Sequence, residues 1–341
     1  MASGKYFIDG GIGWIGMNRT GELTVSGAQP SLFGLRRAGA AMLERHGHRL
    51  GLWLALGAAF GFSFKAIFVK LAYAVPQAVP VDAVTLLSLR MVFALPVFLW
   101  VGLRSSRHAP PLSRRDWLLL TALGLLGYYG ASILDFVGLR YITAGLERLI
   151  LFTYPTLTVM IGVLFMGKKL SRREVAALVL SYAGIGLAFA HDLEFAGETR
   201  VVLIGAAFVF ASSLSYAFYL AGSAPLIQRL GAARFTALAM LVSTGATQLH
   251  FFVTQPLTAL VQPLPVYFYG AAMALFSTVL PVFMQSAAIR RIGSARAVLV
   301  GTIGPMLTIF FGWWLLSEPI SLAQIAGAGL VLIGVLQVSR R

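Results

Sequence analysis

The chain has 341 residues, of which 58% are hydrophobic and 11% are charged, and its formal net charge at pH 7 is +15. An average globular chain carries about 25% charged residues, so this composition excludes soluble domains and indicates a helical membrane protein. Basic residues gather at the ends of apolar runs, which argues against nucleic-acid binding, and the lack of cysteine excludes disulfides and cysteine-based metal or redox sites.

Residues 1–48 are expected to form a cytoplasmic N-terminal tail. Residues 1–30 are rich in glycine and lack the apolar core and cleavage site of a signal peptide, so we expect them to be disordered. Residues 31–49 are basic and loosely amphipathic, which favours a short helix at the lipid surface that leads into the first membrane span.

The rest of the chain predicts an all-α membrane protein with ten transmembrane helices. The apolar runs lie near residues 50–74, 84–103, 116–138, 145–166, 173–190, 201–222, 233–253, 265–289, 295–316 and 321–338. Lysine and arginine concentrate in the loops on one side, whereas the loops of the other side hold Arg140, Arg148 and Arg200. By the positive-inside rule, both termini are cytoplasmic.

The chain contains an internal repeat. The segment from Arg140, "RYITAGLERLILFTYPTLTVM", aligns without a gap with the segment from Arg290, "RRIGSARAVLVGTIGPMLTIF", and Pro155 matches Pro305. We therefore predict two five-helix repeats, at 49–191 and 199–339. An odd number of spans in each repeat places the repeats in opposite orientations, which is a transporter architecture with the substrate site between the halves.

The stretch "LRYITAGLERLILFTYPTLTVMIGVLFMGKKLSRREVAALVLSYAGIGLA" resembles the EamA family of the drug/metabolite transporter superfamily, and "LLSEPISLAQIAGAGLVLIGVL" is similar to its second copy. The resemblance covers roughly residues 50–338. It implies a secondary carrier that works by alternating access, often an exporter of metabolites, amino acids or drugs. The family often has Gly-Glu at the end of the fourth and ninth spans; Glu318 fits the second copy, but the first copy reads Gly167-Lys168-Lys169.

Charged residues interrupt the first two spans. Lys65 lies ~12 Å below the outer end of the first span and Lys70 ~5 Å below it, at 1.5 Å per residue, and their side chains point ~140° apart. We expect Lys70 to reach the outer interface by snorkelling. A lysine near the bilayer centre costs roughly 2.5–3.5 kcal/mol unless it is paired or faces water, so Lys65 and Arg90 of the second span are candidate substrate ligands.

Acidic partners lie at the outer ends of the third and fourth spans, at Asp135 and at the pair Glu147-Arg148. In the functional interpretation, Lys65 and Arg90 face the cavity and at least one of them holds a carboxylate or another anion. Asp135 or Glu147 pairs with the other base or carries a coupling proton. In the structural alternative, these charges form ion pairs that hold the outer helix ends together and never touch substrate. Since a helix start attracts acids in any case, the Glu147-Arg148 pair also fits the structural alternative.

Further candidate residues are aromatic, polar or proline. Tyr128, Tyr154, Tyr216 and Gln285 are candidates for the cavity wall, although buried tyrosine and glutamine side chains can also bond a neighbouring helix. Pro155 and Pro305 are expected to kink their spans and to act as paired gates, or else to shape static packing.

Small-residue tracts give the fifth and tenth spans a different role. Residues 183–186 read "AGIG" and residues 326–329 read "AGAG". Such tracts let helices approach closely, so we predict that these two spans pack tightly away from the cavity. The protein is expected to be a monomer or a homodimer.

No motif of a metallohydrolase, serine hydrolase or ATP-driven pump occurs in the sequence, so we predict that the protein is not an enzyme. The predicted function is a secondary-active carrier in a bacterial inner membrane that exports a small metabolite such as an amino acid or organic anion. The substrate gradient or protons supply the energy. The alternatives are a multidrug or organic-cation exporter and a non-transporting receptor or scaffold.

Overall fold

A computed structural model of the chain describes residues 13–17, 23–27, 32–77, 80–166, 172–196, 198–292, 297 and 300–339. The chain divides into two units, one of residues 1–50 and one of residues 51–341. All candidate site residues belong to the second unit. Lys168 and Lys169 of the first family motif lie outside the described residues.

The first unit contains a β-hairpin followed by the start of a helix. Strand β1 (Gly13–Met17) pairs antiparallel with β2 (Leu23–Gly27), so that Gly13 faces Gly27 in the register. Helix α1 (Leu32–Tyr73) begins in this unit and continues into the second. The expectation of disorder for residues 1–30 is therefore wrong at the two strands, and the helix predicted for residues 31–49 forms from residue 32.

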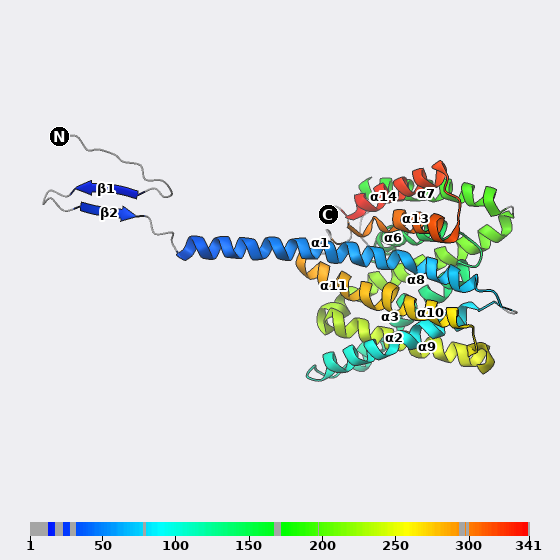
Figure 1. Ribbon diagram of the computed structural model, residues 1–341. Coiled ribbons are helices and arrows are strands. Elements are labelled where there is room, and N and C mark those ends of the chain that lie inside the picture. The colour runs from blue at the N-terminus through cyan, green and yellow to red at the C-terminus, as the bar shows by residue number, and fades with distance from the viewer. Residues whose placement is uncertain are drawn as a thin grey trace. The chain divides into compact units, whose positions relative to one another are not determined.

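The second unit is a helical bundle (Figure 1). After α1, the elements of its first half are α2 (Ala83–Ser106), α3 (Arg114–Gly124), η1 (Leu125–Gly130), α4 (Ala131–Gly138), α5 (Ala144–Leu151), α6 (Tyr154–Met166) and α7 (Arg172–Ala196). Those of its second half are α8 (Thr199–Leu230), α9 (Ala232–Thr254), η2 (Leu257–Leu260), α10 (Leu264–Ala274), η3 (Leu275–Val279), α11 (Leu280–Ile292), α13 (Gly304–Leu316) and α14 (Leu322–Ser339).

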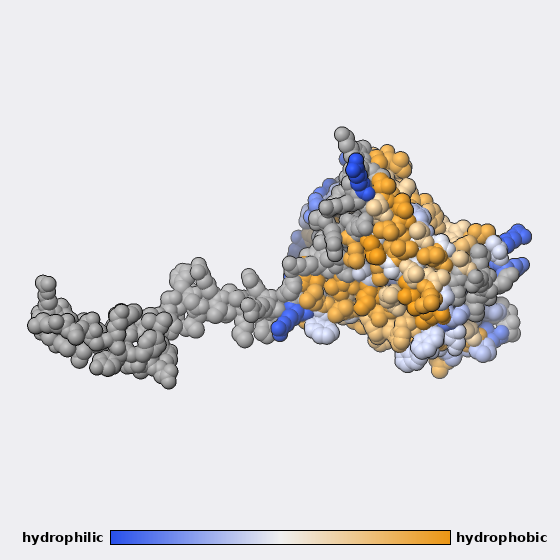
Figure 2. Space-filling view, turned by 90° about the horizontal axis from the view of Figure 1, so that it is seen from above, coloured by the Kyte–Doolittle hydropathy of each residue, from blue (hydrophilic) through white to orange (hydrophobic). Residues whose placement is uncertain are grey.

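Seven helical stretches in the described residues are long and apolar enough to cross a membrane. Three shorter apolar helices, at 175–190, 304–316 and 322–336, coincide with the fifth, ninth and tenth predicted spans. The surface over the bundle is broadly apolar, and hydrophilic residues gather towards its edges (Figure 2). These features make the protein an integral membrane protein, while the count of ten spans stays a prediction.

Polar residues before the apolar runs begin several helices. Asp82 precedes α2 and accepts hydrogen bonds from the backbone amides of Val84 and Thr85. Ser113 forms a reciprocal capping box with Asp116 at the start of α3, and Thr143 caps α5. Each cap satisfies amide groups that have no partner inside the helix, which fixes where the span begins.

The two matching prolines of the internal repeat each lie just after a helix break. Helix α5 ends at Leu151, a turn follows at residues 152–153, and Pro155 lies in the first turn of α6. The second copy has a turn at residues 302–303, and Pro305 lies in the first turn of α13. The expectation that each proline kinks a continuous span is wrong, because a proline in the first turn removes no intrahelical hydrogen bond.

The third and eighth spans share a second irregularity. The wide turn η1 joins α3 to α4, and the wide turn η3 joins α10 to α11 at the matching position of the second repeat. Such π-type turns insert an extra residue into a helix and re-aim the side chains that follow. Both repeats thus carry the same pair of interruptions, one in the third span and one in the fourth.

Helices α7 and α14 pack closely along their length (Figure 1). A Cβ atom at Gly327 would lie 2.4 Å from the carbonyl oxygen of Gly184, and a Cβ at Gly184 would lie 2.4 Å from the carbonyl oxygen of Gly327. Only glycine at both positions permits this approach, so the small-residue tracts form a contact within the chain.

Candidate functional site

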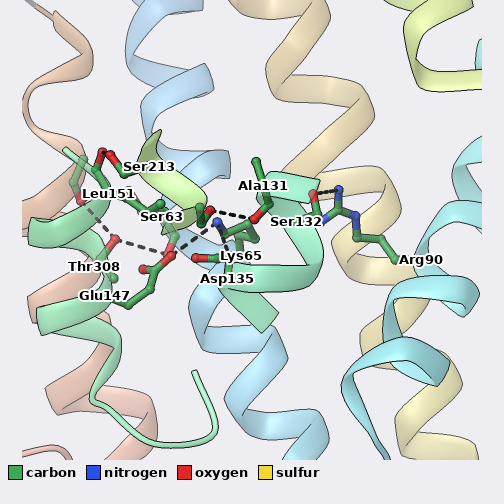
Figure 3. Close-up of polar contacts among 12 residues, drawn as sticks. Ser63, Lys65, Arg90, Ala131, Ser132, Asp135, Glu147, Leu151, Ser213 and Thr308 are labelled. Atoms are coloured by element: carbon green, nitrogen blue, oxygen red, sulfur yellow. Dashed lines mark hydrogen bonds and ion pairs between the residues drawn. The ribbon is translucent and has the colours of Figure 1, made fainter. Parts of the chain in front are cut away.

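Lys65 forms ion pairs with two carboxylates. Its Nζ atom lies 2.7 Å from Asp135 Oδ2 and 3.3 Å from Glu147 Oε1 (Figure 3). The side chains are 2% exposed for Asp135, 0% for Glu147 and 19% for Lys65. Removing one member of such a buried group leaves an uncompensated charge at a cost of about 3–5 kcal/mol, so the three side chains form one electrostatic unit, the Lys65 triad.

Three different elements place the triad. Lys65 comes from the middle of the apolar part of α1, Asp135 from α4 after the π-type turn, and Glu147 from the first turn of α5. The Thr143 hydroxyl oxygen accepts a hydrogen bond from the amide of Leu146 at 3.1 Å, which holds the start of α5 and with it Glu147. Lys65 and Asp135 occupy neighbouring helices whose pairing the sequence alone does not give.

Two guanidinium groups lie near the triad and make fewer contacts. Arg90 donates a hydrogen bond of 3.4 Å from Nη2 to Ser132 Oγ (Figure 3), and its Cζ atom lies 5.3 Å from the centre of the Phe136 ring. Arg148 lies over Phe152 at the same distance. The Nε atoms of both arginines are buried and have no hydrogen-bond partner among the described residues, so each retains donor capacity for an anion.

Lys70 is held inside the protein by two partners. Its Nζ atom donates a hydrogen bond of 2.7 Å to the carbonyl oxygen of Ile142 and lies 3.2 Å from Glu318 Oε1. The prediction that Lys70 reaches the outer interface by snorkelling stays a prediction. The structure adds a carboxylate and a backbone carbonyl within its reach, and both come from segments distant in the sequence.

Glu318 links the second repeat to the first. Its two carboxylate oxygens accept hydrogen bonds of 3.1 and 3.0 Å from the backbone amide of Ala144 at the start of α5. Ser317 adopts a left-handed backbone conformation (φ 55°) after α13, which turns the chain so that Glu318 folds back. The family motif predicts that Glu318 matters, but its partners Lys70 and Ala144 become visible only in the structure.

A cavity of about 390 Å³ lies beside the triad and is lined by side chains of both repeats. Seven of the predicted site residues line it: Lys65, Arg90, Tyr128, Arg148, Tyr154, Tyr216 and Gln285. Asp135 and Glu147 contact the cavity through Lys65, whereas Pro155 and Pro305 do not line it. The volume falls within the range of small-molecule pockets, and a mostly apolar wall with a few convergent polar groups is typical of them.

Tyrosines form one side of the cavity. The hydroxyl groups of Tyr128 and Tyr219 are 2.9 Å apart, the rings of Tyr216 and Tyr219 stack at 5.4 Å, and Tyr154 meets Tyr216 edge to face at 5.1 Å. The hydroxyl of Tyr128 thus bonds another side chain rather than a backbone group. This wall can cover an apolar or aromatic part of a substrate.

The two repeats contribute matching but chemically different residues. Aligning Arg140 with Arg290 places Gln285 opposite Asp135, and Gln285 follows the π-type turn of its own repeat as Asp135 does. A neutral amide therefore replaces the carboxylate in the second repeat, and the charged side chains that line the cavity in the described part of the chain belong to the first repeat.

Sequence reasoning missed several hydroxyl groups around the cavity. Ser213 bonds Thr153 at 2.8 Å and the carbonyl oxygen of Leu151 at 3.2 Å, and Ser63 bonds the carbonyl oxygen of Gly304 at 3.1 Å (Figure 3). The bond from Ser213 satisfies the Leu151 carbonyl, which lies at the end of α5 and has no partner inside that helix. The described part of the chain holds no group of three His, Cys, Asp or Glu residues that could bind a metal ion.

Comparisons with known proteins give one family. A sequence model of the EamA-like transporter family matches residues 49–190 and again 203–340. The uncharacterized transporter YcbK of Bacillus subtilis is 30% identical over 280 residues, which cover 79% of this chain and 86% of YcbK. An uncharacterized transporter of Archaeoglobus fulgidus is 22% identical, with 84% and 98% covered. A crystal structure at 17% identity superposes with a TM-score of 0.59 over 84% of this chain and 95% of its own, which shows the fold.

Proposed function

The chain belongs to the EamA-like transporter family, and from this membership we propose that it is a secondary-active carrier that works by alternating access and exports a small metabolite such as an amino acid or organic anion. The family and the names of its relatives indicate a transporter rather than an enzyme. A cavity of about 390 Å³ between inverted repeats is the expected place for a substrate.

The charged side chains around the cavity are the observation that favours one class of substrate. Three cations, Lys65, Arg90 and Arg148, line it, whereas two carboxylates, Asp135 and Glu147, compensate them from behind Lys65. The described site thus has one positive charge in excess, and this excess favours a substrate with a carboxylate over an organic cation.

An amino acid satisfies both signs of charge at once. Its carboxylate would take the free donor capacity of Arg90 and Arg148, and its ammonium group would approach Asp135 and Glu147 beside Lys65. Its side chain would lie against the cavity wall formed by Tyr128, Tyr154 and Tyr216. An organic anion would use the arginines alone.

The membrane arrangement is part of the same proposal. Ten spans in two inverted repeats, with both termini in the cytoplasm of a bacterial cell, agree with the three short apolar helices and with the distribution of basic residues. The bilayer and a small-molecule substrate are then the partners of the protein, as a monomer or a homodimer.

The test is a thermal melting screen of the purified protein against amino acids, organic acids and organic cations. A ligand at 100 times its dissociation constant stabilises a protein by about 2.7 kcal/mol. We expect carboxylate compounds to raise the melting temperature of the wild type and of Asp82→Asn, which keeps its helix cap, but not of Arg90→Met, which removes a guanidinium proposed to bind the carboxylate. The compounds that stabilise the protein should then exchange in proteoliposome counterflow.

Three outcomes would contradict the proposal. Stabilisation by cations alone would favour a multidrug or organic-cation exporter, for which the tyrosine wall is suited. Equal stabilisation of the wild type and Arg90→Met would remove Arg90 from the binding site. Stabilisation without counterflow would favour a non-transporting receptor or scaffold.

A further inference from the structure

The Lys65 triad holds two carboxyl groups and one ammonium group. Asp135 and Glu147 both contact Lys65 Nζ, at 2.7 Å and 3.3 Å. Two buried carboxyl groups therefore share one ammonium group, which can neutralise only one carboxylate. Neighbouring carboxyl groups that share a buried site commonly retain one proton in this way.

The surroundings of the pair do not remove the need for that proton. Both side chains are buried, and Lys65 is the ion-pair partner of both among the described residues. The charged or titratable groups that face the pair are Lys65 and Tyr73 of α1, Arg90 of α2, and Arg148 of α5. Helices α8 and α14 contribute neutral groups at their contacts with α4 and α5, namely Ser212, Ser213 and Gln324. Thr308 of α13 is also neutral and bonds the carbonyl oxygen of Ser63 in α1.

The arginines are not available to replace the proton. The Arg90 side chain is bonded to Ser132 and lies over Phe136, and Arg148 lies over Phe152. No ion pair joins either arginine to Asp135 or Glu147 in the described residues, where Lys65 is the partner of both acids. The two carboxyl groups can therefore accept one further positive charge. A bound proton supplies this charge, and a substrate ammonium group can supply it equally well and donate hydrogen bonds to the same oxygens.

We propose that Asp135 and Glu147 bind one proton in common and that the ammonium group of an amino-acid substrate displaces it, which makes the carrier a proton antiporter. This rests on the proposed carrier function and names its coupling ion. When the substrate binds, the O–H bond of the protonated carboxyl breaks, the proton passes to water in the cavity, and the ammonium group bonds both carboxylates. When the substrate leaves on the other side, a proton from water returns to the pair.

The exchange gives the direction of coupling. Proton and ammonium compete for the same two carboxylates, so the pair carries one or the other during each crossing. An inward proton gradient then favours outward movement of the substrate, in agreement with the export direction proposed above. The substrate carboxylate stays on the arginines and does not take part in the exchange.

The proton can be measured without a known substrate, by infrared difference spectroscopy of the purified protein. A protonated buried carboxyl gives a C=O stretching band that a carboxylate lacks. We expect one such band in the wild type near neutral pH. Asp135→Asn and Glu147→Gln should each abolish the whole band, because the single carboxylate that remains is neutralised by Lys65. Lys65→Met should enlarge the band, because both carboxyl groups then lack a counter-ion.

The matched control is Asp82→Asn, which removes a carboxylate outside the triad and keeps its oxygen acceptor at the start of α2; its band should equal that of the wild type. Methylammonium chloride serves as the probe for the substrate ammonium. It should reduce the band of the wild type, whereas sodium chloride at the same concentration should not. Size-exclusion chromatography identifies any variant that has not folded, and the wild-type spectrum and its response to methylammonium do not depend on a variant.

A wild type without the band, or a band that persists in both single variants, would overturn the shared proton. A band that ignores methylammonium would overturn the exchange. Counterflow in proteoliposomes made from the same protein separates this failure from failure of the carrier function. Counterflow without the band would support the carrier function and contradict the proton site. The band without counterflow would support the proton site and contradict the carrier function.

Discussion

Lys70 of the first repeat and Glu318 of the second lie 3.2 Å apart, and the pair closes over the start of α5. Lys70 also bonds the carbonyl oxygen of Ile142, and Glu318 bonds the amide of Ala144. Both partners therefore hold the segment from which Glu147 reaches Lys65. The contact joins the two repeats and supports the position of the triad.

We predict that Lys70→Met and Glu318→Gln each lower the free energy of unfolding by about 1–2 kcal/mol, because the pair is partly buried and bonded to backbone groups. The double variant should lose less than the sum of the two single losses, since both remove the same interaction. Denaturation in mixed micelles measures the three variants. Arg107→Met, which removes an exposed charge at the end of α2, is the control and should be neutral. Strictly additive losses would show that the residues do not act as a pair.

Variants of the Lys65 triad distinguish a structural role of its charges from a role in transport. Lys65→Met leaves two buried carboxyl groups without their cation. We expect it to lower the free energy of unfolding near neutral pH by about 3–5 kcal/mol, because the folded state must then keep both groups protonated against the bulk pH. The triple variant Lys65→Met, Asp135→Asn, Glu147→Gln removes all three charges and should recover most of that stability. Its counterflow activity should nevertheless stay at the background level. If the triple variant is both stable and active, the charges serve only to hold the helices together.

The sequence predicts much of the site because the insertion of a charge into an apolar span is costly. Lys65 and Arg90 stand out for that reason, and both line the cavity. The sequence does not predict the partner of Lys70, because Glu318 belongs to the other repeat. A local turn at Ser317 directs Glu318 towards Lys70. Spacing along a single helix tells which residues share a face, but it does not tell which helices are neighbours.

The helix interruptions show a second limit of sequence reasoning. The repeat alignment finds Pro155 and Pro305, yet each proline begins a helix rather than bending one. The π-type turns η1 and η3 have no shared motif, since "LLGYYG" and "LFSTV" have little in common. Their positions depend on packing against other helices, which tertiary structure decides.

The contact between α7 and α14 gives a sharp test of packing. Gly327→Ala places a methyl group against the carbonyl oxygen of Gly184, where only 2.4 Å is available. We expect a loss of about 1–3 kcal/mol, because the backbones of two helices must move apart. Gly186→Ala in the same sequence tract meets nothing within 4 Å and is the matched control, with no loss of melting temperature. Equal melting temperatures for the two variants would contradict the close approach of the helices.

The paired breaks predict opposite effects on access to the cavity. Alanine at Pro155 allows α5 and α6 to join into one continuous helix, and alanine at Pro305 allows the same in the second repeat. Since inverted repeats exchange roles when the carrier turns over, we expect the two variants to stabilise opposite orientations and to slow counterflow. The chain has no cysteine, so Ser286→Cys introduces one label site in the cavity wall. Labelling by a membrane-impermeant maleimide from outside should rise in one proline variant and fall in the other, relative to Ser286→Cys alone. A shift of both variants in the same direction would show that the prolines shape static packing and do not gate.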